Sequence, residues 1–133
     1  MSEPVIRMEN IIKRYYIGKP NELQILNGIN LSVDKGEFVS IVGESGSGKS
    51  TLMNIIGVLD RQTEGNYFLE GKDVNKMGDA MRSAIRNKRI GFVFQNFNLL
   101  PKASALKNVM VPLLYSSEHE KNQKERAMEM LKM

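Results

Sequence analysis

Nine consecutive residues, Gly43 to Thr51, combine glycines and serines with one lysine and end in two hydroxyl side chains. They satisfy the spacing G-x-x-x-x-G-K-[ST], in which small side chains let the backbone wrap around an anion at close distance. Gly46 and Gly48 also permit backbone angles that other residues avoid. Successive N–H groups of such a loop converge on phosphate oxygens. The spacing therefore predicts a phosphate-binding loop.

The polar side chains of this loop are expected to act on the phosphates of a nucleotide. Lys49 supplies a mobile cation for the terminal phosphates, and the Ser50 hydroxyl is a ligand for Mg²⁺. Thr51 adds a hydroxyl and an N–H toward an inner phosphate. The residues expected to bind the nucleotide here are Gly43, Glu44, Ser45, Gly46, Ser47, Gly48, Lys49, Ser50 and Thr51.

A phosphate loop needs a strand before it and a helix after it, and the flanking sequence predicts both. Residues 38–42 are almost continuously apolar, as expected for a strand covered on both faces. Residues 49–59 carry apolar side chains at helical spacing, at Leu52, Ile55, Ile56 and Leu59. The start of that helix adds its positive dipole end to the anion site, worth about 0.3–2 kcal/mol.

The remaining elements are predicted from residue types and periodicity. Asp34–Gly36 has turn chemistry and suggests a hairpin into the strand at 38–42. Capping-box spacing at Ser117–Glu120 predicts a helix that runs toward Met133, with apolar positions Ala127, Met128 and Leu131 in need of a partner surface. The other predicted elements, in chain order, are strands at 5–16 and 29–33, a turn at 63–66, a strand at 67–69, a polar helix at 79–89, a buried strand at 90–94 and a helix at 104–114 disturbed by Pro112.

Composition excludes several classes of protein. The chain has 133 residues and no Cys, so disulfides and thiolate metal sites are excluded. Its one His, His119, disfavours a Ser-His-Asp hydrolase and a multi-histidine metal site. It has neither a long apolar segment nor a secretory signal, which favours a soluble, cytoplasmic protein. The net charge of +4 selects no partner. The basic cluster of Arg82, Arg86, Lys88 and Arg89 lacks interleaved aromatics, so it predicts a solvated helix face and no nucleic acid.

Two stretches resemble the ATP-binding domain of ABC transporters. The first runs from Gly36 through the phosphate loop to Asn54, and the second, Ile90–Pro101, is similar to the Q-loop region of that family. Both are most similar to the exporters for macrolide efflux, lipoprotein release and peptide-antibiotic resistance. The resemblance runs from about Val5 to the C-terminus.

This resemblance implies an α/β fold of the P-loop NTPase type. Its core would be a mixed sheet, with N-terminal antiparallel strands and parallel core strands, followed by the start of a helical subdomain. Residues 1–94 would form the nucleotide-binding core and residues 95–133 the Q-loop and an incomplete helical subdomain. The chain is expected to be the N-terminal part of a longer domain.

The resemblance also assigns roles to single residues. Gln95 would complete the Mg²⁺ shell together with Ser50 and sense the γ-phosphate of ATP. Tyr15 would stack on adenine, with Tyr16 as the rival for that position. In the complete protein, a second ATP-binding domain would close the site, and transmembrane permease subunits would dock near residues 95–111. The apolar side chains Phe97, Leu99 and Leu100 either form part of that dock or pack beneath the loop.

The resemblance further implies a protein held at the inner face of the cell membrane, in which the complete ATPase drives export or extraction. This sequence lacks the LSGGQ-type signature, a Walker-B Asp with its following Glu, and a switch His, because Asp60 is interpreted as the polar end of the helix after the loop. We therefore expect the chain alone to bind Mg-ATP without efficient hydrolysis. Two alternatives stay open: a P-loop kinase of small molecules, and a non-catalytic nucleotide-binding or interaction module.

Overall fold

The structure is a computed structural model, and it describes residues 3–116 and 122–133. It divides into two compact units, Met1–Arg82 and Ser83–Met133, which are described separately below. The phosphate loop lies in the first unit and Gln95 in the second. The functional boundary expected between residues 94 and 95 stays a prediction.

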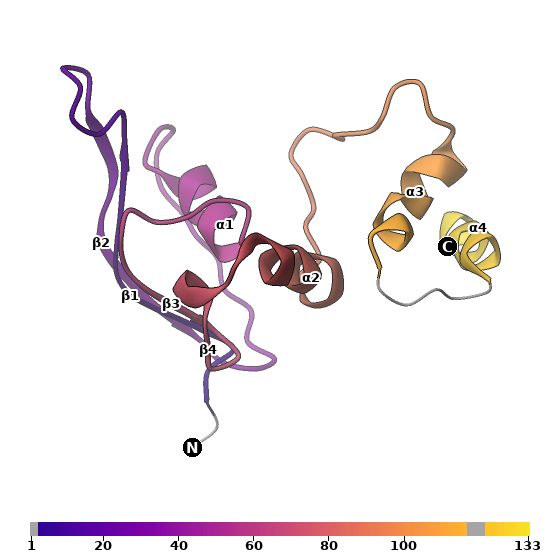
Figure 1. The fold of residues 1–133 in the computed structure, drawn as a ribbon, viewed down its shortest axis with the longest axis horizontal. Coiled ribbons are helices and arrows are strands. Elements are labelled where there is room, and N and C mark those ends of the chain that lie inside the picture. The colour runs from indigo at the N-terminus through magenta and orange to yellow at the C-terminus, as the bar shows by residue number, and fades with distance from the viewer. Residues whose placement is uncertain (1–2, 117–121) are drawn as a thin grey trace. The chain divides into compact units, whose positions relative to one another are not determined.

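An antiparallel sheet organises the first unit. β1 (Ile6–Tyr15), β2 (Leu23–Val33), β3 (Glu64–Leu69) and β4 (Lys72–Asp73) lie in the order β2-β1-β3-β4. β1 and β2 form a long hairpin, visible in Figure 1, in which Tyr15 pairs with Leu23 and Ile6 with Val33. The strands predicted at 5–16, 29–33 and 67–69 are confirmed. The hairpin partner of β2 is β1, however, and not the segment after Asp34–Gly36, so that part of the prediction is wrong.

The helix after the phosphate loop, α1 (Lys49–Ile56), packs against β2 and contributes Leu52 and Ile55 to the core. It ends three residues earlier than predicted because of a left-handed turn at Val58, whose φ is 58°. The N–H of Leu59 bonds to the carbonyl of Asn54 at 2.9 Å, and that of Val58 to Ile55 at 3.0 Å. This pattern closes a helix C-terminus in the Schellman manner. A β-branched residue at the left-handed position is not foreseeable from propensity.

A short 3₁₀ turn, η1 (Val74–Lys76), leads into α2 (Asp79–Arg89), the polar helix with the predicted bounds. One residue of the basic cluster departs from the solvated face expected for it. Arg82 is only 5% exposed, and its Nη2 donates to the carbonyl oxygens of Val58 at 3.1 Å and Asp60 at 3.0 Å. Those carbonyls belong to the turn that ends α1, so burial of the guanidinium is compensated by hydrogen bonds.

In the second unit, α3 (Ala105–Leu114) and α4 (Gln123–Lys132) pack against each other. Ser104 caps α3 by accepting from the N–H of Lys107, and Pro112 lies inside the helix rather than ending it. Ala127 of α4 is buried, so the expected unpartnered stripe is reduced to Met128 and Leu131, which are partly exposed. The predicted capping box at 117–120 lies outside the described residues.

The strands predicted at 38–42 and 90–94 are not formed. Both segments are without regular secondary structure in the described parts of the chain, and Phe38, Val42 and Val93 are 93%, 89% and 96% exposed. A parallel strand has no tight turn that brings a partner to it, so it needs neighbours supplied from elsewhere in the sheet. Among the described residues, no helix is both long and apolar enough to traverse a lipid bilayer.

Candidate functional site

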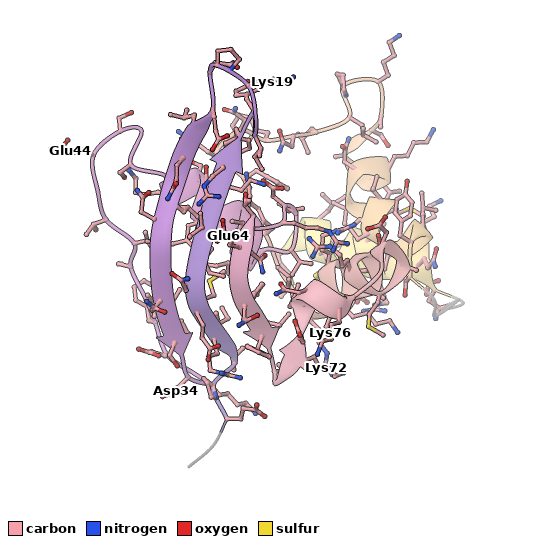
Figure 2. The ribbon with its side chains drawn as sticks, turned by 60° about the vertical axis from the view of Figure 1, so that its left-hand side comes forward. Lys19, Asp34, Glu44, Glu64, Lys72 and Lys76 are labelled. Atoms are coloured by element: carbon pink, nitrogen blue, oxygen red, sulfur yellow. The ribbon has the colours of Figure 1, made fainter. Side chains whose placement is uncertain are left out.

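The phosphate loop joins the irregular segment at 38–42 to the first turn of α1. Gly46 and Gly48 have φ angles of 81° and 92°, in the left-handed region that suits glycine. The N–H of Ser47 bonds to the carbonyl of Glu44 at 3.2 Å and closes a turn around Gly46. Figure 2 labels Glu44 at the outer bend of this loop, with its side chain directed away from the sheet.

Two glycines of the loop make close contacts, and at Gly48 the positive φ adds to them. A Cβ on Gly43 would lie 2.7 Å from the Ser47 hydroxyl oxygen. A Cβ on Gly48 would lie 3.0 Å from the Ile25 side chain and 3.2 Å from the Ile25 carbonyl oxygen. The loop therefore curls tightly on itself and rests on β2, which fixes the start of α1 against the sheet.

Lys49 lies inside the curve of the loop. Its ammonium donates to the carbonyl oxygens of Gly43 at 2.8 Å and Glu44 at 2.6 Å, and to the hydroxyl of Ser47 at 3.3 Å. These contacts hold a positive charge at the concave side of the loop. An anion bound in the loop would lie close to this cation.

The first turn of α1 faces the same loop. N–H groups in a first helical turn have no acceptor within the helix, and no side chain caps α1. They are therefore available to phosphate oxygens, as the helix dipole also favours. Ser50 is exposed in this turn and Thr51 is half-buried.

The loop's donor set suits Mg²⁺ bound together with a nucleotide. Mg²⁺ usually takes one or two protein oxygens and completes its shell with phosphates and water. The exposed Ser50 hydroxyl is one such oxygen. The described residues contain no cluster of three or more His, Cys or acidic side chains that could hold a metal by itself. A nucleotide-dependent Mg²⁺ site fits these residues better than a self-contained one.

Tyr15 is the last residue of β1 and is half-buried, and two side chains contact it. Its hydroxyl donates to Asp60 Oδ2 at 3.4 Å, and the ammonium of Lys13 lies over its ring, 4.9 Å from the centroid. The rival Tyr16 is 57% exposed, with a φ of 57°, in the turn that follows β1. Of the two, Tyr15 has the fixed ring.

Pairing along the hairpin relates Tyr15 to the phosphate loop. Tyr15 pairs with Leu23 of β2, and Gly48 of the loop rests on Ile25 and Leu26 of the same strand. Strand residues rise about 3.3 Å each, so the ring and the loop lie at the same end of the hairpin. The structure thus places the predicted aromatic residue toward the same end of the hairpin as the predicted loop residues.

Sequence reasoning missed Lys13 and placed Asp60 only at a helix end. Asp60 accepts from Lys13 Nζ at 2.8 Å. Burial by itself raises the pKa of Asp60, but hydrogen bonds from Lys13 and the Arg61 N–H, with the charge of Lys13, hold that pKa below its usual value. A signal existed: Ile11, Lys13 and Tyr15 alternate, so they share one face of β1.

Gln95 lies in the second unit, in an exposed segment, and its predicted contact with Mg²⁺ stays a prediction. Phe97, Leu99 and Leu100 are 88%, 63% and 53% exposed, which disfavours the alternative that they pack beneath the loop. The amide of Asn108 holds this segment by accepting from the N–H of Leu100 at 2.7 Å.

Comparison with known proteins decides the family. The family model described as "ABC transporter" matches residues 26–133. The chain belongs to the ABC transporter family. This membership favours the ABC interpretation over the small-molecule kinase, and it agrees with the loop and the Q-loop region on which the resemblance was based.

Relatives of this ABC chain include the lipoprotein-releasing system ATP-binding protein LolD of Aquifex aeolicus, 52% identical over 92% of this chain and 52% of LolD. The macrolide export ATP-binding/permease protein MacB of Syntrophobacter fumaroxidans is 50% identical over 92% of this chain and 17% of MacB. A solved dimer of the ATP-binding cassette MJ0796, bound to ADP and Pi, is 42% identical with a TM-score of 0.84, covering 96% of this chain and 56% of MJ0796.

The similarity to MJ0796 confirms the α/β ATP-binding cassette fold. The chain spans about half the length of LolD and of MJ0796.

Proposed function

We propose that this chain binds Mg-ATP as the nucleotide-binding part of an ABC transporter ATPase. The observation that carries the proposal is Lys49 inside the curled loop, within 2.6–2.8 Å of the Gly43 and Glu44 carbonyl oxygens, at the uncapped start of α1. Binding would exchange those loop carbonyls for phosphate oxygens around the same ammonium. The N–H groups of the loop and the first helical turn would complete the cradle.

We propose that the adenine base and the Mg²⁺ ion of Mg-ATP bind next to the phosphate loop. The ring of Tyr15 would stack on adenine, since it lies at the hairpin end that also holds the loop. Ser50 would bind Mg²⁺ through its hydroxyl, and Gln95 would complete that shell and respond to the γ-phosphate. Each of these contacts needs only a side-chain type that the chain places in the loop, at the strand end or in the Q-loop region.

For the complete protein, we propose ATP hydrolysis that drives export or extraction across a membrane. The names of LolD and MacB associate those relatives with lipoprotein release and macrolide export, and MJ0796 was solved as a dimer. By analogy, a second ATP-binding domain would close the nucleotide site, and permease subunits would dock at residues 95–111 at the inner face of the cell membrane. The exposed Phe97 and Leu99 would be part of that dock.

Calorimetric titration of the chain with Mg-ATP tests the proposal, with Lys49→Ala as the variant and Lys35→Ala as the control. Lys35 is an exposed lysine in the turn after β2, so its loss removes the same charge outside the loop. Charge-assisted hydrogen bonds contribute about 1.5–3 kcal/mol, so Lys49→Ala should weaken binding about 10- to 100-fold. Lys35→Ala should bind like the unaltered chain.

Equal affinities for the Lys49→Ala chain and the unaltered chain would contradict the proposed site. A hydrolysis assay on the same samples tests the second expectation, that the chain binds ATP without efficient turnover. The group that activates water is missing from its sequence. Clear hydrolysis that disappears in Lys49→Ala would refute that expectation and leave the binding site intact.

A further inference from the structure

Lys13 is a buried cation on β1 whose partners are all in the first unit. Its side chain is 11% exposed, and its Nζ lies 2.8 Å from Asp60 Oδ2 and donates to the Arg61 carbonyl oxygen at 2.6 Å. A lysine on the inward face of a strand is costly unless it is paired and hydrogen-bonded. These two oxygens satisfy that need.

The same ammonium also lies over a ring. It is 4.9 Å from the centroid of Tyr15, within the range of a cation–π contact. Asp60 Oδ2, which accepts from Lys13, also accepts from the Tyr15 hydroxyl at 3.4 Å. The ring is therefore held at two places, over one face and at its hydroxyl edge.

Asp60 connects this ring to the phosphate loop. It follows the turn that ends α1, and its N–H bonds to the carbonyl of Asn54 in that helix at 3.1 Å. The other end of α1 begins at Lys49, in the phosphate loop. The short helix thus links the two places: phosphate groups would be bound at its start, and the Tyr15 ring is hydrogen-bonded to Asp60 just beyond its end.

We propose that the Lys13–Asp60 ion pair is a positioning pair that fixes the ring of Tyr15, so that only the face opposite Lys13 receives the base. This inference rests on the proposed function, in which Tyr15 stacks on adenine. With the ammonium over one face, a planar base has one face left on which to stack. Lys13 thereby contributes to affinity for the base without contact with the nucleotide.

An ion pair that merely stabilises the fold would affect all ligands of the loop alike. A positioning pair affects ligands that carry a base and spares those that carry phosphates alone. Two probes separate these cases: Mg-ATP, and inorganic tripolyphosphate with magnesium. The quantity to measure is the ratio of their two dissociation constants, by calorimetry on the full chain.

The central variants are Lys13→Met, Tyr15→Ala and the double variant. We expect Lys13→Met to weaken ATP about fivefold, in the range of a partly desolvated cation–π contact, and to leave tripolyphosphate within about twofold. Tyr15→Ala should lower the affinity for ATP at least as much as Lys13→Met does, and should also spare tripolyphosphate. Since Lys13 acts through the ring, the double variant should lose no more than Tyr15→Ala alone.

Arg14→Met is the matched control, because Arg14 is the next residue of β1 and pairs with Glu64 at 2.6 Å, away from the ring. In Arg14→Met, the ratio of the dissociation constants for Mg-ATP and tripolyphosphate should equal that of the unaltered chain. Lys13→Arg keeps a cation over the ring and should restore most of the ATP affinity. If Lys13→Met does not fold by circular dichroism, Lys13→Met/Asp60→Leu removes both charges together, leaves no unpaired carboxylate, and should show the same selective loss.

Three results would overturn the inference. Equal losses for ATP and tripolyphosphate in Lys13→Met would make the pair a structural one. No loss in Lys13→Met, with a selective loss in Tyr15→Ala, would refute the positioning pair and keep the adenine role of Tyr15. An unchanged ratio in Tyr15→Ala would refute that adenine role, and the inference with it, while Lys49→Ala still tests phosphate binding independently.

Discussion

Strand-forming residues are common both in the β1–β2–β3 sheet and in the two apolar segments at 38–42 and 90–94. Only those of the sheet form paired strands. In the sheet, Met8, Ile11 and Tyr67 are almost fully buried. In the segments, Phe38 and Val93 are 93% and 96% exposed. β1 and β2 find each other within a hairpin, in which Tyr15 pairs with Leu23, and β3 then adds to the free edge of β1.

This difference teaches that apolar composition predicts which segments favour burial in a sheet. It does not predict which other segments cover them. An antiparallel pair can close over a few residues, as β1 and β2 do, whereas a parallel pair always needs a long crossover. The two segments lie in different units of this chain and are unpaired within its described residues. Substitutions in the two regions should therefore have very different costs.

Gly65→Ala should have the largest effect, because β3 approaches β1 closely at this point. Gly65 has a φ of 94°, and a Cβ would lie 2.3 Å from the Asn10 carbonyl oxygen. Strain and overpacking of about 1–3 kcal/mol each predict a loss of about 2–6 kcal/mol in urea unfolding. The control is Gly36→Ala, with a φ of 82° and nothing within 4 Å, which should lose only about 1–2 kcal/mol. Similar losses for both would show that the close strand contact does not matter.

Ile11→Ala against Phe38→Ala tests the comparison directly. Ile11 is 0% exposed in the sheet, so truncation should cost about 2–5 kcal/mol of unfolding free energy. Phe38 is 93% exposed, and its truncation should change stability by less than about 0.5 kcal/mol. Both values come from the same denaturant titration. A large loss for Phe38→Ala would mean that residues 38–42 are covered in solution, contrary to the exposure in the structure.

The phosphate loop and α2 were predictable because their determinants are local. Gly43 to Thr51 carry the spacing themselves, and α2 has an acidic first turn at Asp79 and a basic last turn, which match its dipole. The strands of the β1–β2 hairpin were also predictable from residue type. The predicted loop residues and Tyr15 accordingly lie at one end of that hairpin.

The unpredicted features depend on contacts between distant residues. Asp60 pairs with Lys13 across 47 positions, and Arg82 is buried because the turn after α1 offers it two carbonyl oxygens. Val58 takes a left-handed angle that its type disfavours, since its side chain is fully buried there. None of these has a period or motif, so only the folded arrangement reveals them.

Tyr67→Phe sharpens the contrast between a tyrosine of the sheet and an exposed one. The buried Tyr67 hydroxyl donates to the Ile56 carbonyl oxygen at 2.8 Å, and its loss leaves that acceptor unsatisfied, at a cost of about 1–3 kcal/mol. Tyr115→Phe, at a residue 78% exposed, is the control and should be neutral.

Burial raises the pKa of Tyr67 above its ordinary value, and the charge of Arg82 opposes this only in part. The stabilisation from Tyr67 is therefore complete below about pH 10, the ordinary tyrosine value, and declines as pH rises further. Denaturant titrations at pH 8 and above 10 should show a smaller decline in Tyr67→Phe. An equal decline in both chains would contradict the raised pKa.

Asp60→Asn should give the smallest effect, a loss of stability that is present above about pH 4 and disappears in acid. Because the folded-state pKa of Asp60 lies below its ordinary value, the carboxylate contributes stability that is complete above about pH 4 and is lost as pH falls through the folded pKa. The control is Asp79→Asn, since the Asp79 side chain is 98% exposed. Unfolding free energies from pH 6 down to pH 2 should fall less steeply for Asp60→Asn than for Asp79→Asn. Parallel curves would show that the bond between β1 and the end of α1 does not depend on the Asp60 charge.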